Sequence, residues 1–430
     1  MSPRRSSDAD QPTPTGSDPA AAEGPTAAGP APTPLRRPRG GKPPLITDPA
    51  DVQRVADQLA AGTGPVGVDA ERASGYRYSA RAQLVQLHRA GAGIVLIDPI
   101  ATGDLSAIGE ALSGVEWVLH AAVADLECLA DVGMRPDSLF DTELGGRLAG
   151  YERVALGTMT ENLLGLSLAK GHSAADWSTR PLPGDYLTYA ALDVDVLLEL
   201  RDAVETELRE QGKLDWAREE FEAVRTAQPA PPRPDPWRRT SGLSKVKDRR
   251  GVAIVQSLWT ERDRIGQEQD LAPGRLLPDR TIVAAALAQP RSLQDMLELD
   301  GFTRRTTITF RRQWWKAIAR ALDLREVDLP PRTAPPDPHA PPSRWMGKEP
   351  DVAERYAAAR AVVLAESERL SIPAENLMPP QAIRSLAWDP PTPITAESVD
   401  ARMREYRARD WQRALLAAPV TTALVGVPTA

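Results

Sequence analysis

The stretch Val66-Gly67-Val68-Asp69-Ala70-Glu71 decides how the chain is interpreted. Its apolar residues alternate with Gly67, Asp69 and Glu71, which is the period of a β-strand, so both carboxylates leave one face of that strand. Hard oxygen ligands of this kind suit Mg²⁺ or Mn²⁺. Because 59 of the 430 residues are acidic, an Asp-x-Glu pair is common by chance. The case for a metal site therefore depends on further carboxylates in equally apolar surroundings.

Length and composition limit the other possibilities. A chain of 430 residues is long enough for two or three domains. The net charge of −7 gives no overall basic field, so nucleic-acid binding must come from a local patch. The single cysteine, Cys128, excludes an intrachain disulfide and a cysteine-based zinc site. With no secretory h-region at the start and no run long enough to span a bilayer, we expect a soluble cytoplasmic protein.

Composition divides the chain into a tail, three units and two linkers. Residues 1–43 are rich in Pro, Ala, Gly, Ser and Thr and lack the apolar surface that would offset ordering entropy, so we expect them to be disordered. Five prolines in the eight residues 229–236 indicate a semi-rigid linker. The remaining expected boundaries are an α/β unit over 44–228, a linker over 229–239, a helical unit over 240–325, a linker over 326–342, a helical unit over 343–418 and a tail over 419–430.

The α/β unit is expected to hold a mixed sheet with helices on both sides. Three strand-like runs follow one another, and the loop Ala90–Gly93 suits a hairpin, so they form an antiparallel meander. After Pro99 helical periods alternate with short strands. The expected strands are 66–71, 82–88, 93–98, 116–120 and 139–141.

A third carboxylate, Asp125, stands in the segment His120–Leu129. If this segment is a helix, the neighbours of Asp125 one turn away are alanines, a cysteine and a leucine. A carboxylate in such surroundings is costly unless something positive lies beside it. The alternative is an N-cap or a salt-bridged aspartate near a helix start.

The fourth carboxylate, Asp193, follows Tyr189 by four residues in a helical pattern. This spacing lets both side chains point into one site. Asp195 is a rival for the fourth position, although Glu199 makes its face more polar. Taken alone, Tyr189 fits better as a core aromatic residue with its hydroxyl in solvent.

Four carboxylates can hold two divalent ions about 3.5 to 4 Å apart, an arrangement that stabilises both the attacking and the leaving oxygen of a phosphoryl displacement. The order of these residues resembles the tyrosine branch of the DEDD superfamily of 3'-to-5' exonucleases, and within it the ribonuclease D family. The resemblance covers about residues 44–214. It rests on VGVDAE with the following QLVQLH and IVLIDP, then VLHAAVADLECL, then TRPLPGDYLTYAALDV. It implies a ribonuclease H-like exonuclease domain.

The resemblance also implies a role for each residue. Asp69 would bridge two ions, Mg²⁺ or Mn²⁺, and Glu71 with Asp193 would complete the site of the ion that activates water. Asp125 would support the second ion, and Tyr189 would orient the attacking water. The other branch of the superfamily carries a histidine at the position held here by Thr188, so the tyrosine branch is favoured.

The two helical units resemble HRDC domains, which are small nucleic-acid-binding modules. The motif LSKVKDRRGVAIVQSLWTERDRIGQEQDLAPGRLLPD carries the resemblance in the first unit, and LSIPAENLMPPQAIRSLAW indicates a more divergent copy in the second. Residues 238–325 hold 18 Lys/Arg and 10 Asp/Glu, a local net charge of +8. The alternative is a charged face that is merely solvated. The expected phosphate-binding residues are Lys245, Lys247, Arg249, Arg250, Arg304, Arg305, Arg311, Arg312 and Lys316.

Further side chains near the acidic motifs are candidates for contact with the end of a nucleic-acid strand, with packing or surface positions as the alternative. These are Tyr76, Tyr78, Trp177 and Tyr186 for base stacking, and Gln83, Gln86 and Arg180 for polar contacts.

The resemblance implies a metal-dependent 3'-to-5' exoribonuclease that releases nucleoside 5'-monophosphates from RNA with a free 3' end, such as tRNA precursors, and we expect a monomer. Two alternatives stay open. One is a 3'-to-5' exodeoxyribonuclease with the same mechanism, because a contact to the RNA 2'-hydroxyl cannot be recognised in a sequence. The other is a non-catalytic RNA-binding adaptor, which is disfavoured because all four carboxylates and the tyrosine are present.

Overall fold

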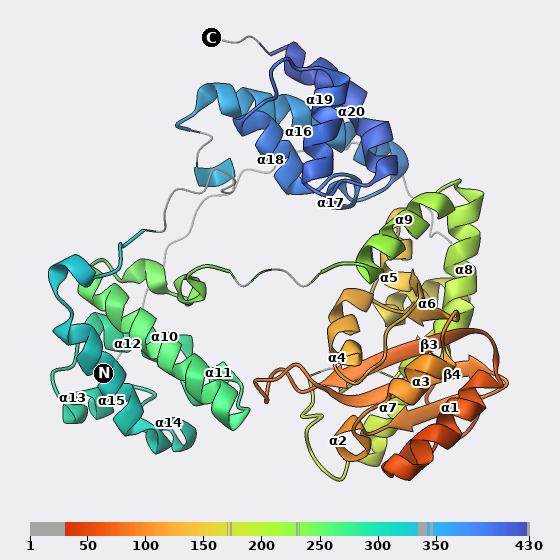
Figure 1. The fold of residues 1–430 in the computed structure, drawn as a ribbon, viewed down its shortest axis with the longest axis horizontal. Coiled ribbons are helices and arrows are strands. Elements are labelled where there is room, and N and C mark those ends of the chain that lie inside the picture. Colours follow the sequence, from red (N-terminus) through yellow and green to blue (C-terminus); the bar gives the residue numbers. More distant parts are fainter. Residues whose placement is uncertain are drawn as a thin grey trace, which may run out of the picture.

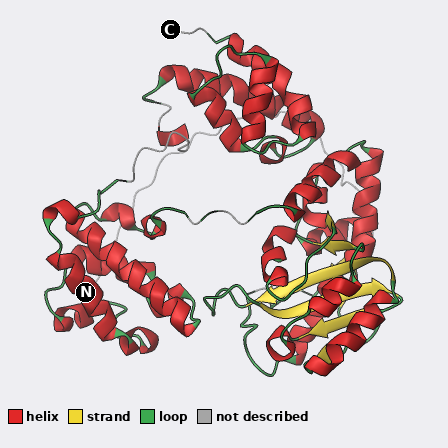
Figure 2. Cartoon of the chain, in the orientation of Figure 1, coloured by secondary structure: helices red, strands yellow, loops and turns green. Residues whose placement is uncertain are grey.

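The computed structural model describes three parts of the chain: an α/β unit and two helical units (Figures 1 and 2). The described residues are 31–169, 171–172, 174–228, 231, 233–333, 342–344 and 347–427. The disorder predicted for residues 1–30 therefore lies outside them. No described helix is both long and apolar enough to cross a membrane.

The α/β unit is built on a six-stranded sheet in the order β2-β5-β4-β3-β6-β7. The strands are β2 (Leu45–Ile46), β3 (Thr63–Arg72), β4 (Ala82–Ala90), β5 (Gly93–Ile97), β6 (Glu116–Leu119) and β7 (Ser138–Asp141). Strand β4 is antiparallel to both of its neighbours, and the other pairs are parallel. The predicted mixed sheet, with its meander β3-β4-β5, is confirmed.

The central strand β3 separates an apolar face from a polar one. Val66 and Val68 are fully buried on one face, beneath helices α1 (Val52–Ala60) and α3 (Ser106–Ala111). Asp69 and Glu71 leave the other face, on which α7 (Gly184–Asp195) packs. Gly67 lies on this second face, and a Cβ there would meet Leu197 at 3.3 Å. A glycine at this position allows the end of α7 to approach the acidic strand.

Further helices complete the α/β unit around the sheet (Figure 1). They are α2 (Pro99–Thr102), α4 (Leu126–Ala130), α5 (Thr142–Ala149), α6 (Leu156–Leu164), α8 (Leu197–Glu210) and α9 (Leu214–Arg225), with 3-10 turns η1 (Pro49–Asp51) and η2 (Ala122–Ala124).

The chain before residue 43 differs from the expected disordered tail. Strand β1 (Thr33–Leu35) pairs in parallel with β8 (Leu166–Leu168). Farther along, the backbone N–H of Arg39 donates to Asp195 at 3.0 Å, and its guanidinium bonds Glu199 at 2.6 Å. Composition measures only the apolar surface available for burial, whereas this segment is held by backbone pairing and ion pairs.

The first helical unit packs around Trp314 and Phe302, both fully buried. Its helices are α10 (Arg249–Gln269), α11 (Pro273–Leu276), α12 (Asp279–Ala288), α13 (Leu293–Glu298), α14 (Arg305–Thr309) and α15 (Arg311–Asp323), with turns η3 (Pro236–Arg239), η4 (Leu243–Lys245) and η5 (Glu326–Asp328). Trp237 and Leu329, expected in linkers, belong to the same core because their side chains are buried in it.

The first helical unit contacts the α/β unit through the loop between β3 and β4. The Tyr78 hydroxyl donates to Asp263 at 2.8 Å, and the Arg275 guanidinium lies 3.8 Å from the centre of the Tyr76 ring. Backbone hydrogen bonds reinforce the contact, from Ser79 to the Asp270 carboxylate and from Ala272 to the Tyr76 carbonyl. Tyr76 and Tyr78 were considered above for base stacking. In the structure, both side chains contact the first helical unit.

The second helical unit repeats the order of elements found in the first. Its helices are α16 (Pro350–Leu370), α17 (Ala374–Leu377), α18 (Pro380–Trp388), α19 (Ala396–Glu405) and α20 (Asp410–Val425), with the turn η6 (Pro342–Arg344) before them. Both α10 and α16 have 21 residues, end on a left-handed residue and precede a four-residue helix. Residues 419–425, expected in a tail, are the last turns of α20, and Val420 and Leu424 are buried.

The second helical unit shares a core with the α/β unit. Leu208 and Phe221 belong to the same apolar cluster as Leu377 and Trp411. The Lys213 ammonium donates to the Leu148 carbonyl at 2.9 Å and to the Leu370 carbonyl at 2.7 Å, and so joins the two units. This contact is apolar and extensive, in contrast to the polar loop contact of the first helical unit.

We predict that Trp411→Ala loosens the α/β unit as well as the second helical unit. The substitution removes a stack on Trp216, whose ring centre lies 4.9 Å away, and a hydrogen bond to Glu220. A loss of about 3–5 kcal/mol in the free energy of unfolding is expected for a buried tryptophan. Hydrogen exchange should then become faster in α9 as well as in α20. Trp315→Ala, in the first helical unit, is the control. Unchanged protection of α9 would mean that the two units unfold independently.

Candidate active site

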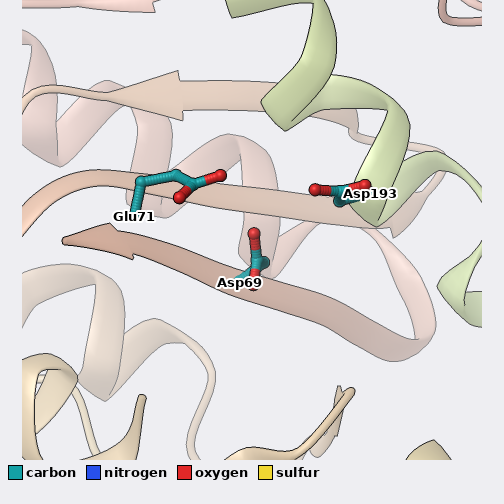
Figure 3. Close-up of side chains that lie close together, drawn as sticks. All are labelled: Asp69, Glu71 and Asp193. Atoms are coloured by element: carbon teal, nitrogen blue, oxygen red, sulfur yellow. The ribbon is translucent and has the colours of Figure 1, made fainter. Parts of the chain in front are cut away.

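Three carboxylates from two elements meet at the polar face of β3. Asp69 and Glu71 come from alternate positions of β3, and Asp193 comes from the last turn of α7. One oxygen of each lies within 4.8 Å of the others. Figure 3 shows the three side chains facing a common point. This is the cluster that the sequence predicted from Asp69 and Glu71 with Asp193 as the fourth acid.

Helix α7 brings Asp193 to the sheet because the helix packs on the sheet through small apolar residues. Ala190 and Ala191 are fully buried against the sheet and allow the helix to lie close to it. Asp195, the rival for the fourth position, is also buried, but its carboxylate accepts from the backbone N–H of Arg39 and lies 3.3 Å from the Arg39 guanidinium. Asp195 therefore anchors the N-terminal segment, and it is not part of the acidic cluster.

Asp125 and Tyr189 line the same cavity as the cluster, which has a volume of about 520 Å³. Asp125 lies between η2 and α4, where its side chain caps no backbone N–H and instead faces the Arg72 guanidinium at 3.4 Å. The aspartate is thus both a cavity residue and a salt-bridged residue near a helix start. Tyr189 and Asp193 both line this cavity, as their spacing suggested, and each influences the pKa of the other.

A buried carboxylate outside the cavity fixes the loop that carries Asp125. Asp141 accepts hydrogen bonds from the backbone N–H groups of Ala121 at 3.0 Å and Ala122 at 2.9 Å. It also caps the start of α5. Ala121 has a left-handed backbone, with φ of 62°, which these bonds hold in place.

Burial and mutual repulsion raise the pKa values of the acidic residues. Burial raises the pKa of Asp69 to about 6, and burial together with Asp69 and Asp193 raises the pKa of Glu71 to about 9. The pKa of Asp125 rises to about 8, first through burial and then through Asp69. Burial also raises the pKa of Asp193 well above its usual range. Without a cation, the cluster therefore cannot hold all of its charges at neutral pH.

The donor set fits a hard divalent cation. All the close donors are carboxylate oxygens, which Mg²⁺ and Mn²⁺ prefer, and no histidine or cysteine joins the cluster among the described residues. A divalent ion would compensate the repulsion that raises these pKa values.

Several other candidates have structural partners instead. Trp177 is fully buried. The Arg180 guanidinium lies 2.7 Å from the Asp98 carboxylate and bonds the Gln83 carbonyl. Gln86 differs, because it is fully buried opposite Asp69 in the β3-β4 ladder and its side-chain amide has no hydrogen-bond partner among the described residues. Tyr186 is half-buried, and its ring lies 5.0 Å from that of Trp177.

The predicted basic residues of the first helical unit fall into two groups. Arg249 bonds the Leu329 and Pro330 carbonyls, and Arg250 bonds carbonyls at the end of α15, so both guanidinium groups hold the unit together. Lys245, Lys247, Arg304, Arg305, Arg311, Arg312 and Lys316 are exposed. The sequence could not separate these groups because a carbonyl partner some 70 to 80 residues away leaves no local pattern.

Sequence reasoning missed two residues near the cluster. Arg72 follows Glu71 directly and lines the cavity, and Glu161 of α6 lines the same cavity. The only available signal was a basic residue adjacent to the Asp-x-Glu pair. That signal is weak in a chain with 52 Lys and Arg residues.

Three family models match successive parts of the chain. Residues 43–209 match a family described as 3'-5' exonuclease, and residues 252–318 match the HRDC domain. Residues 338–424 match a family described as 3' to 5' exonuclease C-terminal domain. The order of these matches follows the α/β unit and the two helical units.

Relatives and solved structures agree with this assignment. Ribonuclease D of Sphingobium indicum is 30% identical over 317 residues, which are 71% of this chain and 78% of that protein. A crystal structure of a protein from Bifidobacterium adolescentis is 35% identical, covers 92% of this chain and 100% of its own, and superposes with a TM-score of 0.84. The structure of Escherichia coli RNase D, at 24% identity, covers 90% of this chain and 100% of its own with a TM-score of 0.64, so it shares the fold.

The fold and its acidic cluster define a 3'-to-5' exonuclease with a site for divalent metal. The second helical unit has its own family match beside the HRDC match of the first. The chain belongs to the ribonuclease D family. The predicted 3'-to-5' exoribonuclease activity is thereby confirmed.

We predict that Asp193→Asn and Asp195→Asn have different effects. Asp193→Asn removes one of the three clustered carboxylates and should lower exonuclease activity at least about a hundredfold, since metal-ion charge stabilisation is worth several kcal/mol. Asp195→Asn should keep most of the activity and lower the free energy of unfolding by about 1 kcal/mol, because its partner Arg39 is partly exposed. Mn²⁺ affinity by calorimetry and thermal unfolding distinguish the two effects. Loss of Mn²⁺ binding in Asp195→Asn alone would assign the fourth ligand to Asp195.

Proposed function

We propose that this chain trims the 3' ends of structured RNA, tRNA precursors among them, with two divalent ions and releases nucleoside 5'-monophosphates. Asp69, Glu71 and Asp193 would hold one ion, and Asp69 with Asp125 would hold the other. The convergence of three carboxylates within 4.8 Å in a cavity is the observation that carries the proposal. The ions would supply a more acidic water and neutralise phosphate charge.

Tyr189 positions the attacking water in this mechanism. Burial, followed by the charge of Asp193, raises the pKa of its hydroxyl, so the group stays protonated at neutral pH and orients water without acting as a base. The water oxygen bonds to the phosphorus of the last linkage, and the bond between phosphorus and the 3'-oxygen breaks. The 3'-oxygen takes a proton and becomes the new 3' end, and the phosphate leaves on the 5' carbon of the released nucleoside.

The two helical units would add RNA-binding surface to that of the α/β unit. The first carries exposed Arg304, Arg305 and Lys316, and it is joined to the catalytic strand through the β3-β4 loop. The relative from Escherichia coli is described as an exoribonuclease involved in structured RNA processing, which supports the choice of substrate. We also propose that the protein acts as a monomer, and that it acts in the cytoplasm, where tRNA precursors would be its substrates.

The first test is degradation of a 5'-labelled RNA hairpin with a 3' overhang. We expect stepwise shortening in Mg²⁺ or Mn²⁺, none in EDTA, and none with Asp69→Ala, because this residue contributes to both proposed ions. The released nucleotides should be identified by chromatography as 5'-monophosphates.

The matching DNA hairpin serves as the control for substrate class. Attack on DNA at the same rate would change the substrate to nucleic acid in general. Retained binding without shortening of either strand would favour an RNA-binding adaptor. Activity of Asp69→Ala would contradict the proposed metal site.

We predict that Arg304→Ser together with Arg305→Ser weakens binding to the hairpin and flattens its salt dependence. Each phosphate contact on a single strand contributes about 0.7 to the slope of log affinity against log salt, so the slope should fall by about 1.4. Fluorescence anisotropy at several salt concentrations measures it. The control is Arg54→Ser with Arg360→Ser, two exposed arginines of the other units. Equal slopes for the two double variants would mean that Arg304 and Arg305 are only solvated.

A further inference from the structure

Arg72 stands out in the cavity because its charge is opposite to that of its neighbours. It ends β3, directly after Glu71, and its side chain is 30% exposed. Among the described residues that line the cavity it is the only arginine or lysine, beside five carboxylates. The approach of an anionic phosphodiester to such a cavity requires cationic partners in addition to the carboxylates.

The guanidinium of Arg72 is incompletely bonded. Its one ion-pair contact with a described residue, Asp125, is 3.4 Å long, whereas charge-assisted hydrogen bonds of this type are about 2.7–2.9 Å. Its Nε atom is buried and has no hydrogen-bond partner among the protein atoms of the described residues. A buried donor without a partner is costly, so an arginine kept for structure alone is expected to be saturated.

Two arginines elsewhere in the chain have shorter and more numerous contacts than Arg72, whereas a third, Arg409, also has a buried Nε without a hydrogen-bond partner among the described residues. Arg180 bonds Asp98 and three backbone carbonyls, and Arg262 bonds both the Leu277 carbonyl and the Asp279 carboxylate. Arg72 differs from both, although it lies in a region of dense negative charge. Its remaining N–H groups are therefore available for an acceptor that enters the cavity.

We propose that Arg72 contacts the substrate, its guanidinium binding a non-bridging phosphate oxygen near the 3' end of the RNA, while Asp125 holds it between turnovers. The inference rests on the proposed function. A guanidinium matches phosphate because its planar fork can donate two parallel hydrogen bonds. The weak contact with Asp125 allows the exchange of one anion for another, and Asp125 would then be free to serve as a metal ligand.

The test is a double-mutant cycle that combines substitution of Arg72 with removal of the charge of one phosphate at a time. Wild type, Arg72→Met and Arg72→Lys are assayed in Mg²⁺ on RNA whose last three linkages are replaced, one at a time, by an uncharged methylphosphonate. We expect Arg72→Met to lower kcat/KM about 10- to 100-fold on normal RNA, the worth of a hydrogen bond to a charged group. At the contacted linkage, the neutral substitution should impair wild type at least about tenfold and Arg72→Met hardly at all. Arg72→Lys should retain part of the effect.

Calorimetry with Mn²⁺ in the absence of RNA separates this role from a structural one, and Arg54→Met, a change of the same type on the surface, is the control. Arg72→Met should bind Mn²⁺ within about threefold of wild type, since removing a cation leaves the carboxylates in place. Equal penalties in wild type and Arg72→Met at every linkage, or a loss of Mn²⁺ affinity that accounts for the loss of activity, would overturn the inference and leave the exoribonuclease intact. A wild type that shortens no RNA would overturn the proposed function as well.

Discussion

The repulsion between carboxylates that the fold forces together is the constraint on which the rest of the structure depends. Three acids from β3 and α7 share a space in which one oxygen of each lies within 4.8 Å of the others. Such a cluster lowers the free energy of unfolding unless a cation or protons compensate it. The sheet, the small residues of α7 and the close approach at Gly67 together resist the separation of these groups.

The chain treats its other buried acids differently, and the contrast identifies the site. Asp141 accepts backbone hydrogen bonds from two segments, Asp98 pairs with Arg180, and Asp195 pairs with Arg39. Each of these carboxylates is satisfied by the protein itself. The carboxylates of the cavity have one long contact to Arg72 and the Tyr189 hydroxyl, and otherwise mainly one another. A partly buried acid without a cationic or hydrogen-bonding partner in the protein is a candidate ligand, and among the described residues the cavity gathers several of them.

The parts of the structure that the sequence predicted are those set by local patterns. The alternation around Asp69 and Glu71 gave the strand and the direction of both side chains, and the four-residue spacing of Tyr189 and Asp193 gave their common site. What could not be predicted depends on pairs far apart in the chain. Arg39 and Asp195 are separated by 156 residues, so a segment that composition marks as disordered forms a strand and an ion pair. The roles of Arg249 and Arg250 likewise depend on distant carbonyls, that of Leu329 for Arg249 and that of Ala321 at the end of α15 for Arg250.

The two helical units are attached to the catalytic unit by different kinds of contact, and this difference bears on how RNA is held. The second unit shares an apolar core with α8 and α9, and the Lys213 ammonium bridges the two units, so their separation would expose a large apolar surface. The first unit is held by polar contacts to a single loop, Tyr78 to Asp263 among them. Contacts of this kind exchange readily with water and can break and reform at low cost. That loop continues directly from Arg72 at the end of β3, so the first helical unit is attached next to the strand that carries Asp69 and Glu71.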